Sequence, residues 1–246
     1  MVRASIIGGS GYTGGELLRL LTAHPEMDVV QVTSRSHLGE YVYQVHPNLR
    51  KQSSLKFTDP QKLEPTDVLF LALPHGKAQS KINEYAEAAD YIIDLSADFR
   101  LRDANHYENW YGKPHAAPDW LGKFVYGLPE LYRQELKTAH YVSGVGCNAT
   151  AVNLALLPLH ESDLLDTHQA VIAEIKVGSS EGGAAVNDGS HHPERSGVIR
   201  TYSAFGHRHT AEVIQELGLQ KLNLTMTSVD LVRGSLATVH TSVPAG

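Results

Sequence analysis

Apolar runs alternate with helix-compatible segments through the first 150 residues of the chain. The clearest run, 67–73, has the length and the nearly continuous apolar character of a strand that helices cover on both faces. The pattern predicts strands at 2–8, 29–33, 67–73, 91–95 and 141–143 and helices at 16–21, 78–89 and 147–157. Such repeated alternation indicates a doubly wound α/β domain of the Rossmann type, whose ligand crevice lies at the carboxyl ends of the strands.

The last hundred residues are dominated by strand-like segments at 169–177, 222–229 and 234–243, with one helix-like segment at 210–217. They predict a second domain of α+β type with a mixed sheet. We therefore expect a nucleotide-binding domain at 1–148 and a substrate and oligomer domain at 149–246. Residues 102–129 are rich in Tyr, Trp, His and Pro without a clear period, and we expect an ordered irregular insertion there.

Charge and hydropathy narrow the class of protein. The chain has 21 basic and 27 acidic residues, a formal net charge of −6, and no run of Lys or Arg, so nucleic acid is not an expected partner. Its longest apolar runs fall far short of the roughly 18 residues that a membrane-spanning helix needs. No secretory signal is visible at the N-terminus. We expect a cytoplasmic protein.

A glycine-rich turn joins the first strand to the first helix. The glycines fall as G-x-x-G-x-x-G at Gly8, Gly11 and Gly14. Such a turn lets the backbone approach a pyrophosphate at a helix N-terminus, where free N–H groups and the helix dipole favour anions. Strand–helix turns of this kind also occur without a ligand, but the α/β context favours a dinucleotide.

The end of the second strand distinguishes the two nicotinamide cofactors. It carries Ser34, Arg35 and Ser36 at the position where an NAD-binding unit usually has an acidic residue for the ribose. A guanidinium and two hydroxyls suit a 2′-phosphate, so the sequence predicts NADP over NAD. The alternative is that Arg35 is an exposed loop charge.

The single cysteine, Cys147, follows the turn 144–146 and opens a helix. A helix N-terminus stabilises a thiolate and makes the cysteine nucleophilic near pH 7. The alternative is an inert cysteine packed against the sheet. A thiolate together with a nicotinamide cofactor suggests thioester chemistry, in which the cysteine attacks an activated acyl group and hydride reduces the thioester to an aldehyde.

Several motifs together resemble a known family. They are Gly8–Glu16 (GGSGYTGGE), Ala72–Gly76 (ALPHG), Asp94–Leu101 (DLSADFRL), Tyr126–Glu130 (YGLPE), Gly206–Glu212 (GHRHTAE) and Arg233–Gly234. Their order is similar to that in the N-acetyl-gamma-glutamyl-phosphate reductases, and especially in their lysine-pathway relatives, which reduce an acyl phosphate attached to the carrier protein LysW. The resemblance implies an NADPH-dependent acyl-phosphate reductase that makes a semialdehyde in lysine or arginine biosynthesis.

The resemblance also implies roles for individual residues. Cys147 would be the nucleophile and His207 the acid–base group, with His209 beside the substrate. A purely structural His207 at the start of a helix is the alternative, and a metal site at this H-x-H pair is the weaker one because no Cys, Asp or Glu cluster accompanies it. The residues that would hold the phosphates of NADP are Gly8, Ser10, Gly11, Tyr12, Thr13 and Gly14, with Ser34, Arg35 and Ser36 at the 2′-phosphate.

Two departures from the usual family pattern point to the carrier-protein branch. The chain has Val145–Thr150 (VGCNAT) where arginine-pathway members usually have PGCYPT, and it contains the segments 178–183 and 190–196. Clustered cations in this region would receive an acidic carrier tail, although an ordinary solvated loop is the alternative. The residues expected to contact substrate or carrier are Ser179, His191, His192, Arg195 and Arg200, besides His209.

The family usually continues for about a hundred further residues, so we expect this chain to be truncated at its C-terminus. The resemblance also implies a homo-oligomer, a tetramer. Two other functions remain open: an aspartate-semialdehyde dehydrogenase, which shares the glycine-rich turn, the cysteine and a histidine, and a non-catalytic fragment that binds NADP or the carrier.

Overall fold

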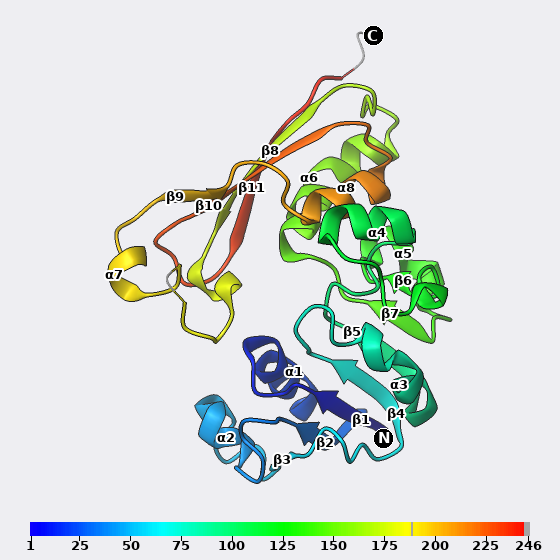
Figure 1. The fold of residues 1–246 in the computed structure, drawn as a ribbon, viewed down its shortest axis with the longest axis vertical. Helices are drawn as coiled ribbons and strands as arrows, with labels where there is room; N and C mark the ends of the chain where they lie inside the picture. The colour runs from blue at the N-terminus through cyan, green and yellow to red at the C-terminus, as the bar shows by residue number, and fades with distance from the viewer. Residues whose placement is uncertain (188, 244–246) are drawn as a thin grey trace. The chain divides into compact units, whose positions relative to one another are not determined.

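The computed structural model describes residues 1–187 and 189–243, which form two compact units (Figure 1). Unit 1 comprises residues 1–104 and 115–144. Unit 2 comprises residues 105–114 and the chain from Val145 onward.

Unit 1 is built on a seven-stranded parallel sheet, as the alternating pattern predicts. Its strand order is β3-β2-β1-β4-β5-β7-β6. Because every pairing is parallel, all the strands direct their carboxyl ends to one edge of the sheet. The strands are β1 (Val2–Ile7), β2 (Met27–Thr33), β3 (Phe57–Thr58), β4 (Thr66–Leu71), β5 (Ala89–Asp94), β6 (Val125–Tyr126) and β7 (Tyr141–Ser143).

Two separate apolar clusters hold the sheet of unit 1 between its helices. Successive residues of a strand face opposite sides, so Ile6 packs in one cluster with Leu18, whereas Ile7 packs in the other with Ile82. The strands are apolar on both faces for this reason. The helices and turns of this unit are α1 (Tyr12–Thr22), α2 (Val42–Val45), η1 (Pro47–Leu49), η2 (Gln79–Lys81), α3 (Ile82–Ala88), η3 (Pro118–Trp120) and α5 (Pro129–Leu136).

The segment 102–129 is ordered, but the expectation that it is irregular is wrong in part. It contains the helix α4 (Ala104–Tyr111), as well as η3 and β6. Tyr107 is the one buried side chain of α4, and its ring stacks on that of Tyr111 at 4.6 Å. The segment is rich in polar and aromatic residues and buries only one side chain, so it lacks the apolar stripe by which a core-facing helix is recognised in the sequence.

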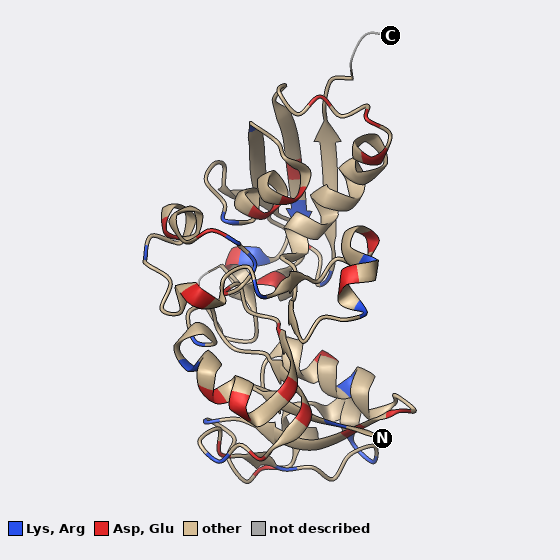
Figure 2. Ribbon diagram, turned by 90° about the vertical axis from the view of Figure 1, so that its right-hand side faces the viewer, with Lys and Arg blue, Asp and Glu red and all other residues tan. Residues whose placement is uncertain are grey.

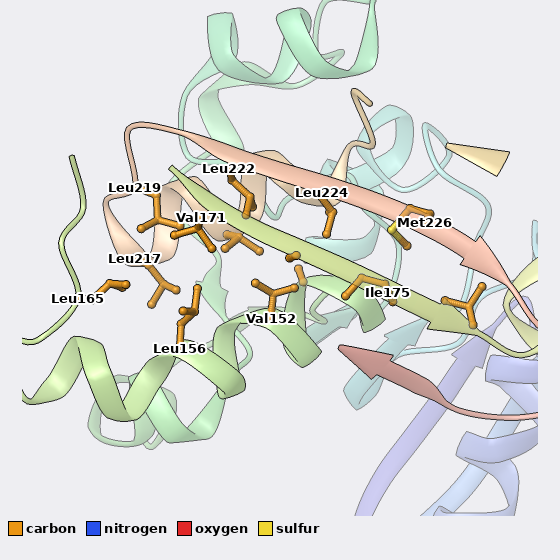
Figure 3. Close-up of a cluster of buried hydrophobic side chains, with 14 residues drawn as sticks. Val152, Leu156, Leu165, Val171, Ile175, Leu217, Leu219, Leu222, Leu224 and Met226 are labelled. Atoms are coloured by element: carbon orange, nitrogen blue, oxygen red, sulfur yellow. The ribbon is translucent and has the colours of Figure 1, made fainter. Parts of the chain in front are cut away.

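Unit 2 contains the predicted mixed sheet, in the order β11-β8-β10-β9. The strands β8 (Val171–Val177) and β10 (Leu222–Ser228) are parallel, and β9 (Arg200–Ser203) and β11 (Ser235–His240) pair antiparallel at the two edges. Figure 3 shows side chains of α6 (Cys147–Glu161), among them Val152 and Leu156, pointing toward Val171 and Ile175 of β8. The helix α8 (His209–Leu217) completes this core with Leu217.

Two features of unit 2 were not expected from the sequence. The helix α6 continues through Pro158 to Glu161 instead of ending at residue 157. The connection between β8 and β9 contains two short helical turns, η4 (Ser179–Gly182) and α7 (His192–Arg195).

Acidic and basic positions are interspersed along the ribbon of each unit (Figure 2), in keeping with the modest net charge of −6. Within residues 1–187 and 189–243, no helix is long and apolar enough to cross a membrane.

A buried carboxyl group ends the strand β5. Asp94 is fully buried and accepts hydrogen bonds from the backbone N–H of Ser96 at 3.0 Å and from its hydroxyl at 2.8 Å. Burial disfavours the ionised form and raises the pKa of Asp94 to about 7, although the bonds from Ser96 oppose this shift.

We expect the raised pKa of Asp94 to make the fold less stable as pH rises from about 4 to 7. In the unfolded chain this carboxyl loses its proton near its ordinary pKa of 3.8, whereas in the folded chain it keeps the proton up to about 7. Relative to Asp94→Asn, the wild type should therefore lose up to about 4 kcal/mol of unfolding free energy across this window. Urea unfolding at several pH values measures the difference. Asp90→Asn, an exposed position on the same strand, is the control, and parallel curves for wild type and Asp94→Asn would contradict the shift.

Candidate active site

The predicted dinucleotide turn lies at the carboxyl end of β1. Gly8 has φ of +84°, and a Cβ there would lie 2.4 Å from the carbonyl oxygen of Ala72, so the position requires glycine. Gly11 is the N-cap of α1, and a Cβ on it would meet no atom within 4 Å. The turn is therefore tight where it meets the sheet and open where a ligand would approach the helix N-terminus. Tyr12, Thr13 and Gly14 form the first turn of α1.

Hydroxyl groups connect this turn to the end of β2. Ser34 donates a hydrogen bond to the hydroxyl of Ser10 at 3.0 Å, and its own oxygen lies 3.4 Å from that of Ser36. The structure thus brings together three of the residues that the sequence assigns to the cofactor. His46 also supports the turn, because its Nε2 lies 2.8 Å from the carbonyl oxygen of Gly9.

A cavity of about 400 Å³ opens beside this turn in unit 1. Gly8, Ser34 and Arg35, three of the residues that the sequence assigns to the cofactor, line it. Its other walls hold polar and apolar residues that the sequence did not assign to the site. The remaining lining residues are Ile7, Thr33, Asp59, Pro60, Gln61, Leu73, Lys77, Ser80, Lys81 and Tyr85.

Cys147 lies in unit 2, at the first position of α6, and its side chain is exposed. The first turn of this fifteen-residue helix has no acidic residue. Its free N–H groups and dipole therefore favour a negative charge at the thiol. The thiol is exposed and so is not packed against the sheet, whereas its reactivity stays a prediction.

The helix α8 presents a histidine and a glutamate to the residue that precedes Cys147. Glu212, which is fully buried, accepts a hydrogen bond from the backbone N–H of Gly146 at 2.8 Å. A Cβ on Gly146 would lie 2.8 Å from Nε2 of His209, so the imidazole packs directly on this residue. Nε2 of His209 is also 3.9 Å from Oε1 of Glu212. Glu212 was missed as an individual residue, although the motif Gly206–Glu212 contains it.

His207, the predicted acid–base residue, is half-buried and stacks edge-on against His209, with the ring centroids 4.6 Å apart. Its Nδ1 accepts a hydrogen bond from the backbone N–H of His209 at 3.3 Å. Burial, assisted by the neighbouring charge of Arg208, lowers the pKa of His207 to about 4. His207 is therefore neutral at pH 7.

A second group of polar side chains surrounds the start of α6. Asn148 donates to Oε1 of Glu181 at 2.7 Å and accepts from the hydroxyl of Ser235 at 2.7 Å, while the hydroxyl of Tyr202 donates to the same Glu181 oxygen at 3.1 Å. Burial and the negative charges of Glu181 and Cys147 raise the pKa of Tyr202, so its proton stays on. This network ties α6 to η4, β9 and β11.

The residues expected to contact the carrier lie in the connection between β8 and β9, except Arg200, which is the first residue of β9. His191, His192 and Arg200 are exposed, whereas Ser179 is half-buried with its backbone N–H bonded to the carbonyl of Leu231 at 2.8 Å. Arg195 differs from them, because its Nη2 donates to the carbonyls of Val177 at 3.0 Å and Val229 at 3.1 Å. Arg195 therefore holds the ends of two strands together.

In the part of the chain that the structure describes, no group of three or more His, Cys, Asp or Glu residues could hold a metal ion.

Comparison with known proteins identifies two domains of one family. The profile described as "Semialdehyde dehydrogenase, NAD binding domain" matches residues 3–139, and that described as "Semialdehyde dehydrogenase, dimerisation domain" matches residues 147–246. A relative from Thermomicrobium roseum is 55% identical over 244 residues, which are 98% of this chain and 69% of that protein. The relatives therefore extend beyond the matched region.

Two further relatives have names that state an activity. The Sulfurisphaera tokodaii protein, named LysW-L-2-aminoadipate/LysW-L-glutamate phosphate reductase, is 50% identical over 98% of this chain and 71% of its own length. The Deinococcus radiodurans protein, named LysW-L-2-aminoadipate 6-phosphate reductase, is 49% identical over 98% of this chain and 70% of its own length.

Solved structures share the fold at low identity. Aspartate semialdehyde dehydrogenase with NADP from Candida albicans has a TM-score of 0.70 at 14% identity and covers all of this chain with 73% of its own. The Vibrio cholerae enzyme II, complexed with ASA, has a TM-score of 0.71 at 13% identity and covers all of this chain with 75% of its own. These likenesses show the fold alone.

The geometry of Cys147 generates a testable expectation. Because the thiol is exposed at a helix N-terminus, its pKa should lie below the reference of about 8.5, and iodoacetamide should alkylate it rapidly at pH 7. The chain has one cysteine, so the mass of a single adduct reports this site. The alkylation rate measured against pH gives the midpoint of thiol ionisation, and the urea-unfolded protein is the control. A midpoint at or above that of the unfolded chain would show that the helix does not activate the thiol.

Proposed function

Because the chain belongs to the semialdehyde dehydrogenase family, we propose that it uses NADPH to reduce a carrier-linked acyl phosphate to a semialdehyde through a thioester on Cys147. The observation that carries the proposal is the exposed cysteine at the start of α6, with His209 and Glu212 packed against the residue before it. Relatives that are 49–50% identical and carry the name of LysW-linked phosphate reductases support the choice of substrate.

Several features of unit 1 support the binding of NADPH. The open N-cap Gly11 and the first turn of α1 would bind the pyrophosphate, and the cavity at Gly8 would take the adenosine. Ser34, Ser36 and Arg35 would bind the 2′-phosphate, which favours NADP over NAD. When bound, NADPH supplies the hydride that reduces the acyl group.

In unit 2, Cys147 would carry the substrate. Its thiolate attacks the carbonyl carbon of the acyl phosphate and the C–S bond forms. The bond between the carbonyl carbon and the bridging phosphate oxygen breaks, and inorganic phosphate leaves. Free N–H groups in the first turn of α6 stabilise the negative oxygen during this step. After reduction of the thioester the C–S bond breaks, the semialdehyde leaves and Cys147 returns as a thiolate.

The contacts favour His209 as the group that holds the thiol proton. Its ring lies against Gly146, and the buried Glu212 carboxylate is placed to stabilise an imidazolium. That His207 has this role stays a prediction. The neutral His207 would then position the His209 ring by stacking on it and by accepting the bond from its backbone N–H.

The carrier would approach exposed basic residues in the connection between β8 and β9 and at the start of β9. His191, His192 and Arg200 can attract an acidic segment, whereas Arg195 is already bonded to two backbone carbonyls. We also propose a homo-oligomer, for which the open face of the mixed sheet, with Ile172 and Leu236 exposed, offers a surface.

Running the reaction in reverse tests the function and the two histidines. With NADP and inorganic phosphate, the carrier-linked aminoadipate semialdehyde should form NADPH, and Cys147→Ser should reduce the rate to background. His209→Gln should lower kcat by about 10²-fold or more, and His207→Gln by less than about tenfold. Free N-acetylglutamate semialdehyde and aspartate semialdehyde are the competing substrates.

Each alternative has its own outcome. Turnover of aspartate semialdehyde alone would favour the dehydrogenase of that substrate, and no turnover with any semialdehyde would favour a binding fragment. A kcat limb with a midpoint near pH 4 that disappears in His207→Gln would assign the acid–base role to His207.

Charge reversal tests the carrier surface. Arg200→Glu should raise the Kd of the acidic carrier by roughly tenfold or more at low salt, with the difference shrinking as salt screens the charges. Lys221→Glu is the matched control, because Lys221 is exposed just before β10 and Arg200 pairs with Ser228 at the far end of that strand. Equal effects of the two reversals would show that only net charge matters and that this surface does not receive the carrier.

A further inference from the structure

We propose that Lys77 is a second cation for the 2′-phosphate of NADP and acts together with Arg35, an inference that rests on the proposed NADP dependence. The two residues are 42 positions apart in the sequence but line the same cavity of unit 1. Arg35 follows β2 and Lys77 follows β4, and these two strands flank β1 in the sheet. Parallel pairing therefore places both cations at the edge where a dinucleotide binds.

Both cations keep their charge available for a ligand. Throughout residues 1–187 and 189–243, no carboxylate oxygen lies within 4.0 Å of a side-chain nitrogen of Arg35 or Lys77. Asp59, the acidic residue in the cavity wall, accepts a bond from the backbone N–H of Gln61 at 2.9 Å and forms no ion pair with either cation. Neither Arg35 nor Lys77 is neutralised by an ion pair, and the three cations of the wall outnumber its one carboxylate, which suits an anionic group.

A third cation in the same wall differs in this respect. Nζ of Lys81 lies 2.8 Å from a carboxylate oxygen of Glu84, so its charge is already paired. Lys81 therefore provides an internal comparison, because it shares the side-chain type and the cavity but not the free charge.

A buried carboxylate fixes the backbone on both sides of Lys77. The buried carboxylate of Asp98 accepts hydrogen bonds from the backbone N–H groups of Gly76 at 2.6 Å and Gln79 at 3.0 Å, on either side of Lys77. Burial raises the pKa of Asp98. Its hydrogen bonds, of which that with His75 has the largest effect, lower the pKa by more than burial raises it, so the net shift is downward. Asp98 therefore stays ionised and keeps this turn in place.

Two cations at the 2′-phosphate would contribute to the binding free energy of NADP but not to that of NAD. Hydrogen bonds to charged groups contribute about 1.5–3 kcal/mol each, and NAD has a hydroxyl where NADP has the 2′-phosphate. Removing Lys77 should therefore weaken NADP and leave NAD nearly unchanged. Arg35 alone would then not account for the whole preference for NADP over NAD.

Calorimetric titration of the 246-residue chain with NADP, NAD, 2′,5′-ADP and 5′-AMP measures the effect without turnover. Lys77→Met keeps most of the apolar stem and removes the charge. It should raise the Kd of NADP and of 2′,5′-ADP by roughly tenfold or more, while the Kd values of NAD and 5′-AMP change by less than about threefold. Lys81→Met should change all four Kd values by less than about threefold. Lys77→Arg should retain the preference for NADP over NAD.

The outcomes separate this inference from the proposed function. If wild type binds NADP and NAD equally, the NADP dependence itself is wrong. If wild type prefers NADP but Lys77→Met changes both cofactors equally, or neither, Lys77 is not a 2′-phosphate ligand while the NADP dependence stands. A loss in Lys81→Met as large as in Lys77→Met would assign the effect to the general charge of the cavity and overturn the specific role of Lys77.

Discussion

The parallel pairing of β1 with β2 on one side and β4 on the other is the constraint on which the nucleotide cavity depends. Parallel strands end at the same edge, so the turns after these strands must converge there. Gly8, Arg35 and Lys77 come from three different turns and meet in one cavity for this reason. A sheet with one of these strands reversed would separate the cations from the glycine-rich turn, whatever its composition.

In unit 2 the corresponding constraint is a single carboxylate. Glu212 is fully buried, and its contact with the N–H of Gly146 joins α8 to the residue that begins α6. A buried charge is costly unless polar partners satisfy it, so this bond fixes how the two helices meet. The position of His209 against Gly146 follows, because it lies one helical turn before Glu212.

The two cation groups in this protein differ in what their charges do. Arg195 is bonded to the carbonyls of two strand ends and stabilises the fold of unit 2, whereas Arg35 and Lys77 face a cavity without an acidic partner. Basic residues outside the two sheets thus serve different purposes. Their hydrogen-bond partners, which the sequence does not display, distinguish them.

The sequence by itself determined the doubly wound sheet, the mixed second sheet and the place of Cys147 at a helix start, because each rests on a local period or on turn residues. It did not reveal α4, where only Tyr107 is buried, nor the passage of α6 through Pro158. Only the tertiary structure decided that His209 contacts Gly146, that Arg195 is bonded to backbone and that Lys77 shares a cavity with Arg35. These contacts join residues from separate elements, and such proximity depends on how the sheets and helices pack, which no local pattern in the chain records.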